Sequence, residues 1–100
     1  MLTIPLTAGE NQDFKVVLAG QLCRIQVYEN STGLYMDLTI NSIPVRYSQL
    51  CVDRIPMFTS EYLGFIGRLM FEDTQGKSDP TLDGLGSRYQ LHYLQAGIDF

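Results

Sequence analysis

Hydrophobic and polar side chains alternate along much of the chain with a period of two residues. The hydrophobic positions form the runs Phe14-Val16-Leu18, Cys23-Ile25-Val27 and Leu34-Met36-Leu38-Ile40. Successive side chains of a β-strand point to opposite faces of a sheet, so each run indicates a strand with one buried face. The pattern therefore predicts an all-β fold, a small single-domain antiparallel β-barrel or sandwich of about 6–8 short strands.

Turn-forming residues separate these runs at the places that such a fold requires. Tight turns are predicted at Gly20-Gln21, at residues 30–33 and at Asn41-Ser42. The predicted strands cover residues 12–19, 21–29, 34–40 and 43–47, a segment around Leu69 and Phe71, and residues 88–94, after an extended segment over 1–6. Pro5 and Pro44 favour the edge of a sheet for the segments that contain them.

Two long stretches lack the alternation and are predicted to be loops, at residues 48–67 and 72–87. The second is rich in turn residues, with Gly76, Pro80, Gly84 and Gly86 at its corners. The first instead carries many large apolar side chains, interrupted by Pro56 and glycines, which indicates an irregular segment that folds back on the domain.

The apolar side chains of residues 55–66 allow two compatible interpretations. In one, the segment covers an open end of its own domain, because most large apolar side chains are buried within their own fold. In the other, it forms an assembly surface, since contiguous exposed apolar area marks partner contacts. Aromatic residues and Met are enriched in interface cores, so the candidate partner-binding residues are Met57, Phe58, Tyr62 and Phe65.

Size and charge limit the possible functions. The 100 residues fit one domain, residues 1–100, and the net charge is −4 with seven scattered basic residues. No basic stripe is present, so we expect no nucleic-acid partner. We also expect no membrane span, because no apolar run approaches about 18 residues. Cys23 and Cys51 lie among apolar neighbours and are expected to be buried free thiols.

The sequence offers little material for catalysis. His92 is the single histidine, and in its predicted strand it shares a face with Arg88 and Gln90. No partner that would position it as a base is evident, and the motifs of nucleophile elbows, zinc sites and P-loops are absent. The acidic residues Asp73, Asp79 and Asp83 do not have the spacing of a calcium loop and read as a solvated turn. We therefore expect a protein that is not an enzyme, with no cofactor and no metal.

The order of motifs along nearly the whole chain resembles a known family, the small baseplate plug proteins of contractile-tailed bacteriophages, of the cyanophage type. The residues that carry the resemblance are Ile4-Pro5-Leu6, Gln12-x-Phe14-x-Val16-x-Leu18-x-Gly20-Gln21, Ile25-x-Val27-Tyr28-x-Asn30, Gly33-x-Tyr35-x-Asp37-Leu38 and Leu85-Gly86-x-Arg88-Tyr89-x-Leu91-x-Tyr93-Leu94.

The resemblance implies a structural virion protein. Such a plug packs centrally in the baseplate against hub, tail tube and spike proteins and closes or organises the end of the tube. It implies several copies in the assembly, a place in the phage tail baseplate after synthesis in the host bacterial cytoplasm, and no catalytic residues. The alternative is a non-enzymatic β-barrel binding module for a peptide or a small ligand, which would need a concave pocket with converging polar groups.

Overall fold

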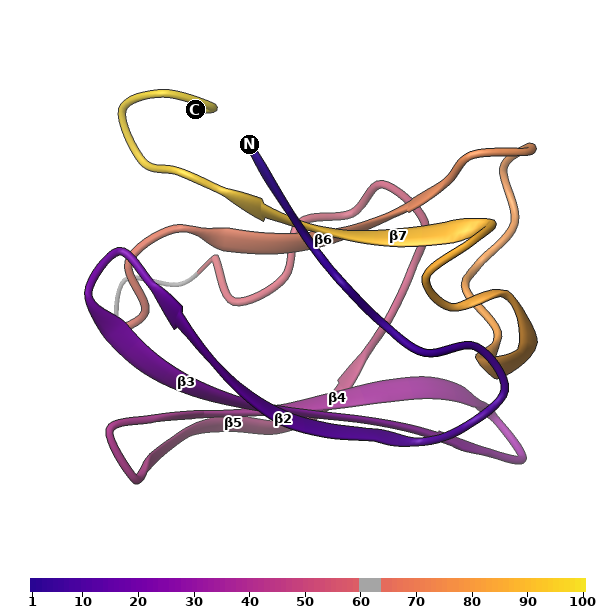
Figure 1. The fold of residues 1–100 in the computed structure, drawn as a ribbon, viewed down its shortest axis with the longest axis horizontal. Helices are drawn as coiled ribbons and strands as arrows, with labels where there is room; N and C mark the ends of the chain where they lie inside the picture. The colour runs from indigo at the N-terminus through magenta and orange to yellow at the C-terminus, as the bar shows by residue number, and fades with distance from the viewer. Residues whose placement is uncertain (60–63) are drawn as a thin grey trace.

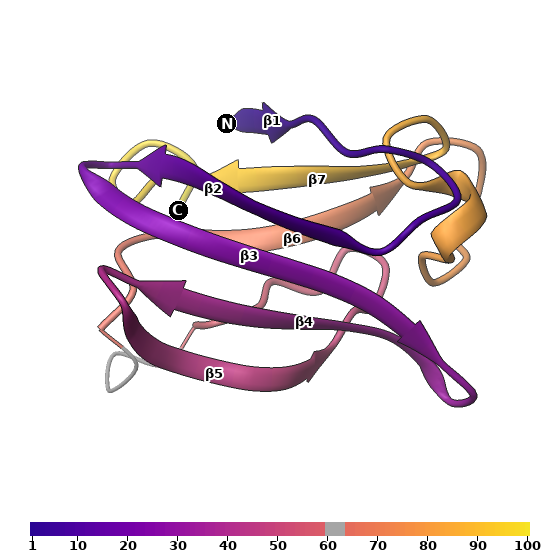
Figure 2. The same ribbon diagram turned by 60° about the horizontal axis from the view of Figure 1, so that its bottom comes forward.

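The computed structural model describes residues 1–59 and 64–100, and these form two antiparallel β-sheets packed face to face (Figures 1 and 2). The elements are β1 (Leu2–Ile4), β2 (Gln12–Leu18), β3 (Gln21–Asn30), β4 (Gly33–Ile40), β5 (Ile43–Leu50), β6 (Arg68–Asp73), the short 3₁₀ turn η2 (Leu82–Gly84) and β7 (Tyr89–Leu94). The prediction of an all-β fold is confirmed. The sheets do not close into a barrel, so the fold is a sandwich.

The larger sheet has the strand order β2-β3-β4-β5, each strand pairing with its neighbour in sequence. Two-residue turns join β2 to β3 and β4 to β5, with the flanking pairs Leu18↔Gln21 and Ile40↔Ile43. Both residues of each turn have positive φ, 50° and 75° at Ala19-Gly20 and 50° and 67° at Asn41-Ser42. Such turns match the right-handed twist of the strands that they join, and they fix the register of the sheet.

The smaller sheet has the order β1-β7-β6 and is assembled from both ends of the chain. β1 lies antiparallel to β7 in the register Leu2↔Tyr93 to Ile4↔Leu91. β6 and β7 are separated in sequence by the loop that contains η2. The chain therefore changes sheet twice, between β1 and β2 and again between β5 and β6 (Figure 2).

The core lies between the two sheets and consists of their inward-facing side chains. On β3 and β4 the predicted alternation is confirmed, because every second residue is buried. The opposing sheet contributes inward-facing Leu69, Phe71 and Leu91, which are fully buried. The larger sheet is less completely covered at its margins, where Phe14 and Val16 of β2 and Val45 of β5 are only half-buried.

β5 runs three residues beyond the predicted strand, because irregular pairing conceals its alternation. Its register with β4 shifts between Met36 and Leu38 and again between Leu38 and Thr39. Ser48 lies in this strand with φ of 58°. Each bulge turns the following side chains to the other face, so the period of two residues disappears from the sequence while the strand continues to Leu50.

Residues 51–59 and 64–67 lie in the predicted irregular segment and cross from one sheet to the other. The first part runs along the free edge of β6, where Asp53 bridges to Phe71 and Met57 bridges to Leu69. The backbone N–H of Met57 donates to the carbonyl of Leu69 at 2.7 Å. This crossing therefore continues the smaller sheet irregularly and protects its β6 edge.

Candidate functional site

The structure places three of the four candidate partner-binding residues in the core of the domain. Met57, Phe58 and Phe65 are 3%, 3% and 8% exposed, and Tyr62 lies outside the described residues. The rings of Phe58 and Phe65 meet edge to face with centroids 6.2 Å apart, and Phe65 packs against Tyr93 at 5.9 Å. This packing agrees with the interpretation that the segment covers its own domain, and their role in binding a partner stays a prediction.

Polar contacts hold the second part of the crossing against both sheets. The side chain of Gln21, at the β2–β3 turn, accepts from the N–H of Ile66 at 2.9 Å and donates to its carbonyl at 3.0 Å. The Tyr93 hydroxyl of β7 donates to the same carbonyl. The side chain of Ile66 is left 56% exposed by this arrangement.

One end of the sandwich, which we call the apolar end, gathers exposed hydrophobic side chains. It consists of the β2–β3 turn, the β4–β5 turn, residues 64–67 and the tail 95–100, on the left in Figure 1. The exposed large hydrophobic residues on these segments and the adjoining strand ends are Val17, Leu22, Ile43, Ile66, Ile98 and Phe100, with exposed fractions between 45% and 73%. Exposed apolar residues gathered in this way mark sites of protein association.

A depression of about 250 Å³ lies within the apolar end. Its lining residues are Phe58, Thr59, Phe65, Ile66, Gly67, Arg68, Ala96 and Phe100. The guanidinium of Arg68 lies 4.0 Å from the ring centroid of Phe100 and holds this aromatic side chain against β6. The two buried phenylalanines therefore contribute to the wall of a depression whose lining also includes the exposed residues Thr59, Ile66, Ala96 and Phe100.

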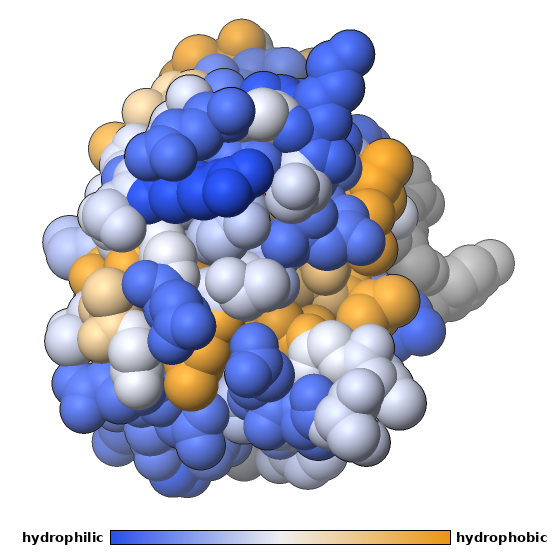
Figure 3. Space-filling view, turned by 90° about the vertical axis from the view of Figure 1, so that its right-hand side faces the viewer, coloured by the Kyte–Doolittle hydropathy of each residue, from blue (hydrophilic) through white to orange (hydrophobic). Residues whose placement is uncertain are grey.

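The opposite end of the sandwich, which we call the polar end, has a different character. It consists of the β3–β4 turn and the loops over residues 5–11 and 74–88, and hydrophilic side chains cover most of it, with only small hydrophobic patches between them (Figure 3). Exposed Glu10, Lys77, Asp79 and Asp83 lie on these segments, and exposed Glu29 lies near the adjoining end of β3. The molecule is thus apolar at one end of its sheets and polar at the other.

Asp73 organises the polar end from the inside. Its carboxylate is fully buried and accepts two hydrogen bonds of 2.9 Å from the Arg88 guanidinium, as well as the N–H groups of Gln75 and Ser78. The guanidinium, followed by these N–H groups, holds the pKa of Asp73 well below its usual range, although burial opposes the shift. The sequence placed Asp73 in a solvated turn, whereas its register with Leu69 and Phe71 on β6 was the signal that it faces inward.

The described residues contain no group of three or more His, Cys, Asp or Glu side chains that could hold a metal ion. Asp79, which the sequence placed beside Asp73, instead accepts the backbone N–H of Asp53 at 3.0 Å. The carboxylate of Asp53 in turn accepts the N–H of Asp73 at 2.8 Å. These acidic side chains therefore serve as hydrogen-bond acceptors that tie the loop after β6 to the crossing.

His92 is more buried than its sequence position indicated. It is 6% exposed, and its ring nitrogens lie 3.0 Å from the Thr3 hydroxyl on β1 and 2.9 Å from the Glu72 carboxylate on β6. The three side chains form a row across all three strands of the smaller sheet. None of them lines the depressions at the apolar end, on the outer face of the larger sheet or beside the β4–β5 turn. The row satisfies the hydrogen bonds of the imidazole and fastens β1 to the sheet.

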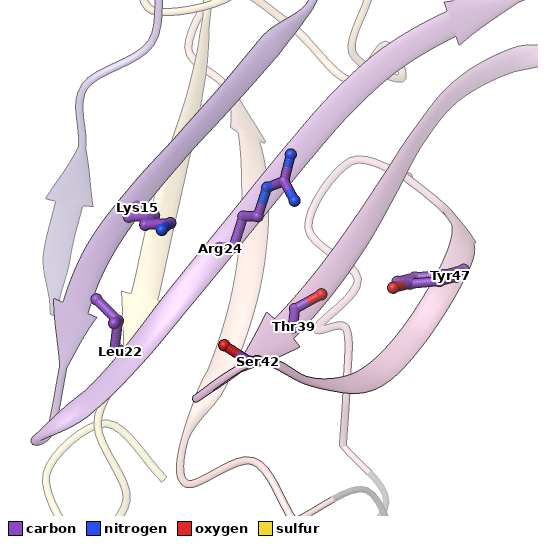
Figure 4. Close-up of a pocket in the computed structure, with 6 residues that line it drawn as sticks. All are labelled: Lys15, Leu22, Arg24, Thr39, Ser42 and Tyr47. Atoms are coloured by element: carbon purple, nitrogen blue, oxygen red, sulfur yellow. The ribbon is translucent and has the colours of Figure 1, made fainter.

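The outer face of the larger sheet has a shallow depression of about 250 Å³ (Figure 4). It is lined by Lys15, Leu22, Arg24, Thr39, Ser42 and Tyr47 from β2, β3, β4, the β4–β5 turn and β5. Arg24 is already engaged, because it forms a two-bond ion pair with Asp13 at 3.0 and 2.8 Å. A third depression, of about 230 Å³, lies beside the β4–β5 turn and includes Ile43 and Pro44.

The two cysteines are free and buried, as the sequence predicted. Burial raises the pKa of the Cys51 thiol to about 12 and also raises the pKa of Cys23. Both are therefore thiols, rather than reactive thiolates, at neutral pH. No helix within residues 1–59 and 64–100 is long and apolar enough to cross a membrane.

The fold and surfaces define a small β-sandwich protein with one apolar end. Comparison with known families matches residues 1–96 to the family described as the cyanophage baseplate Pam3 plug gp18. The chain belongs to this family, which confirms the resemblance seen in its sequence motifs. Membership supports a structural role in the baseplate of a phage virion, in association with other baseplate components. No curated protein matches the chain.

Proposed function

We propose that the protein packs centrally in the baseplate against hub, tail tube and spike proteins, and closes or organises the end of the tube. Membership of the plug family supports this role. The single structural observation that carries it is the apolar end, which contrasts with the charged polar end. A molecule with this asymmetry can bury one end in an assembly and present the other to water.

The depression at the apolar end supplies a specific way to bind. An apolar side chain of a partner that entered it would contact Phe58 and Phe65 on its wall, and Ile66 and Phe100 around it. The central contacts of an interface lie in such desolvated pockets, and aromatic residues are prominent among them. We therefore keep Met57, Phe58 and Phe65 in the proposed site as residues that shape it from within, and we include Tyr62 on the basis of the sequence.

The proposal has three further parts. The protein acts without catalysis, because the row Thr3-His92-Glu72 serves the smaller sheet and lines none of the described depressions. It is made in the host cytoplasm, where buried thiols such as Cys23 and Cys51 stay reduced. It occupies the baseplate in several copies, since parts around a tail axis are related by rotation.

The test compares complexes formed with the hub and spike proteins by light scattering. The unaltered protein is expected to form a complex of defined mass. Ile66→Asp is expected to remain folded and to lose that complex, because it places a charge beside the depression. Leu50→Asp is the matched control: Leu50 is also exposed, at 44%, but lies beside Gly33 at the polar end, so its complex is expected to persist.

Two results would contradict the proposal. If the protein binds none of the hub, tube and spike proteins, the proposed position in the baseplate is wrong. If the Ile66→Asp and Leu50→Asp variants bind equally well, the protein assembles through a surface other than the apolar end.

A further inference from the structure

The two sheets have four edges, and three of these carry features that discourage another strand from pairing. β1 has three residues and is followed by Pro5, and β5 contains Pro44 and two register shifts. The β6 edge is covered by the bridges to Asp53 and Met57. β2 has seven residues, no proline and an unbroken register with β3. Because proteins usually block such edges, a regular open edge is a candidate for pairing.

The backbone of β2 offers hydrogen-bonding groups on its open side. Leu18 and Gln21 flank a two-residue turn and form a hydrogen-bonded pair, and this pattern alternates along an antiparallel ladder. Asp13, Lys15 and Val17 consequently direct their N–H and C=O groups away from β3. In residues 1–59 and 64–100, no loop or cap donates to or accepts from these backbone groups.

The side chains of β2 are complementary to a second copy of the same strand. In an antiparallel pair centred on Phe14, Asp13 lies opposite Lys15 of the second copy, and the arrangement occurs twice by symmetry. Opposite charges on directly facing residues stabilise a sheet. Centring the pair on Asp13 or Lys15 instead would place like charges opposite each other. Lys15 makes no ion pair with any residue that the structure describes.

The inner face of β2 also favours the same pairing. Phe14 and Val16 point toward the core but are only half-buried, because the three-stranded sheet does not cover this margin fully. With Phe14 at the centre, its ring would face the equivalent ring of the second copy, and each ring would cover apolar surface of the other. Aromatic cross-strand pairs of this kind stabilise sheets.

We propose that the free edge of β2 pairs with β2 of a second copy, antiparallel and centred on Phe14, to give a dimer with one continuous eight-stranded sheet. The outward backbone groups of Asp13 and Lys15 form the hydrogen bonds. Each Asp13 carboxylate, which binds Arg24 of its own sheet, also forms an ion pair with Lys15 of the second copy. The contact is small, so the dimer is weak and forms at high protein concentration. This inference concerns the protein alone and does not depend on the proposed place in the baseplate.

The first test measures mass by sedimentation equilibrium from micromolar to millimolar concentration. The unaltered chain is expected to shift from monomer to dimer. Lys15→Glu places like charges opposite each other twice, so the dissociation constant of the dimer should rise about tenfold or more. Lys77→Glu makes the same change of net charge on the polar end and should leave the constant unchanged.

A proline variant tests the backbone contribution. Lys15→Pro removes an outward N–H that the dimer uses without removing a hydrogen bond to β3, so circular dichroism should show a folded protein that dimerises less than Lys15→Ala, which removes the charge alone. Monomer at every concentration for the unaltered chain would overturn the proposal. A dimer that Lys15→Glu leaves intact would also overturn it, because that dimer must form elsewhere, for example through the apolar end.

A cross-link tests the register. Cα atoms of a directly opposed pair without mutual hydrogen bonds lie about 4.5 Å apart, within the range of a disulfide. Phe14→Cys should therefore form a covalent dimer in oxidised glutathione. Gln12→Cys, which would lie opposite Val16 of the second copy, should not. Cross-linking of Gln12→Cys but not of Phe14→Cys would show that the register is wrong.

Discussion

At the scale of single residues, burial separates two ion pairs that look alike. Asp73 with Arg88 and Asp13 with Arg24 both use the arginine Nε and Nη2 atoms and two carboxylate oxygens. The Asp73 side chain is 0% exposed, whereas that of Asp13 is 51% exposed. Exposed pairs contribute little to stability, while removal of one partner of a buried pair leaves a charge without compensation.

Asp73→Asn is therefore expected to lower Tm clearly, and Asp13→Asn, the matched control, to change it little. The folded protein holds the pKa of Asp73 below its usual value of about 3.9. The stabilisation that the ionised Asp73 carboxylate gives to the folded protein is thus complete above that pH. It is lost as the pH falls through the lower pKa that Asp73 has in the folded protein. Thermal unfolding from pH 7 to pH 2 should show a Tm difference between Asp73→Asn and the unaltered protein that is constant near neutrality and shrinks below about pH 4. A difference that grew toward low pH would contradict this assignment.

At the scale of elements, the contact between two loops depends on the absence of one side chain. Gly86 has φ of 77°, and a Cβ atom there would collide with the backbone carbonyl of Leu6, between β1 and β2. The Leu6 loop joins a strand of the smaller sheet to one of the larger sheet, and the Gly86 loop joins β6 to β7 within the smaller sheet. Because paired strands anchor both loops at each end, neither loop can move away freely. The sequence marked Gly86 as a turn residue, but only the fold shows what approaches it.

Gly86→Ala is expected to destabilise the protein more than Gly97→Ala does. Both positions have positive φ, 77° and 80°, so alanine strains the backbone at both, but nothing lies within 4 Å of a Cβ at Gly97. The difference in the free energy of unfolding between the two variants isolates the collision with Leu6, and it should reach about 2 kcal/mol or more. Urea titration followed by circular dichroism measures it, and equal stabilities of the two variants would contradict the described contact.

The elements also show how far a sequence can predict this fold. Strands such as β3 and β4 alternate fully and are joined by two-residue turns, so the period of their hydrophobic residues predicts them. The end of β5 cannot be predicted in this way, because its bulges reverse which face of the strand each side chain points to. Strand pairing between β1 and β7 joins residues some 90 positions apart in the chain (Leu2↔Tyr93, Thr3↔His92, Ile4↔Leu91), and no local pattern indicates it.

At the scale of the whole molecule, the division between core and surface depends on how the two sheets meet. Phe58 and Ile66 belong to one apolar segment of the sequence, yet Phe58 is 3% exposed and Ile66 is 56% exposed. The apolar composition of this segment indicates that it either covers the domain or binds a partner, but composition cannot separate its buried residues from its exposed ones. The apolar end likewise combines residues from turns and a tail that are distant in sequence.

Phe58→Ala is expected to cost about 3–5 kcal/mol of folding free energy, because it opens a cavity in the core. Ile66→Ala should change that free energy by only about 0.5 kcal/mol, as exposed positions usually do. Denaturant unfolding of both variants measures the contrast. A small effect of Phe58→Ala would show that this ring lies outside the core.

The strand order has a consequence for the order of events during synthesis. The four strands of the larger sheet are consecutive in the chain and can pair as they leave the ribosome. β1 emerges before all of them, yet its only strand partner in the described structure is β7, which follows every other strand of the two sheets in the chain. The first strand must therefore wait unpaired until β7 has been made, and the inner face of the finished meander stays open to chaperones for the same interval.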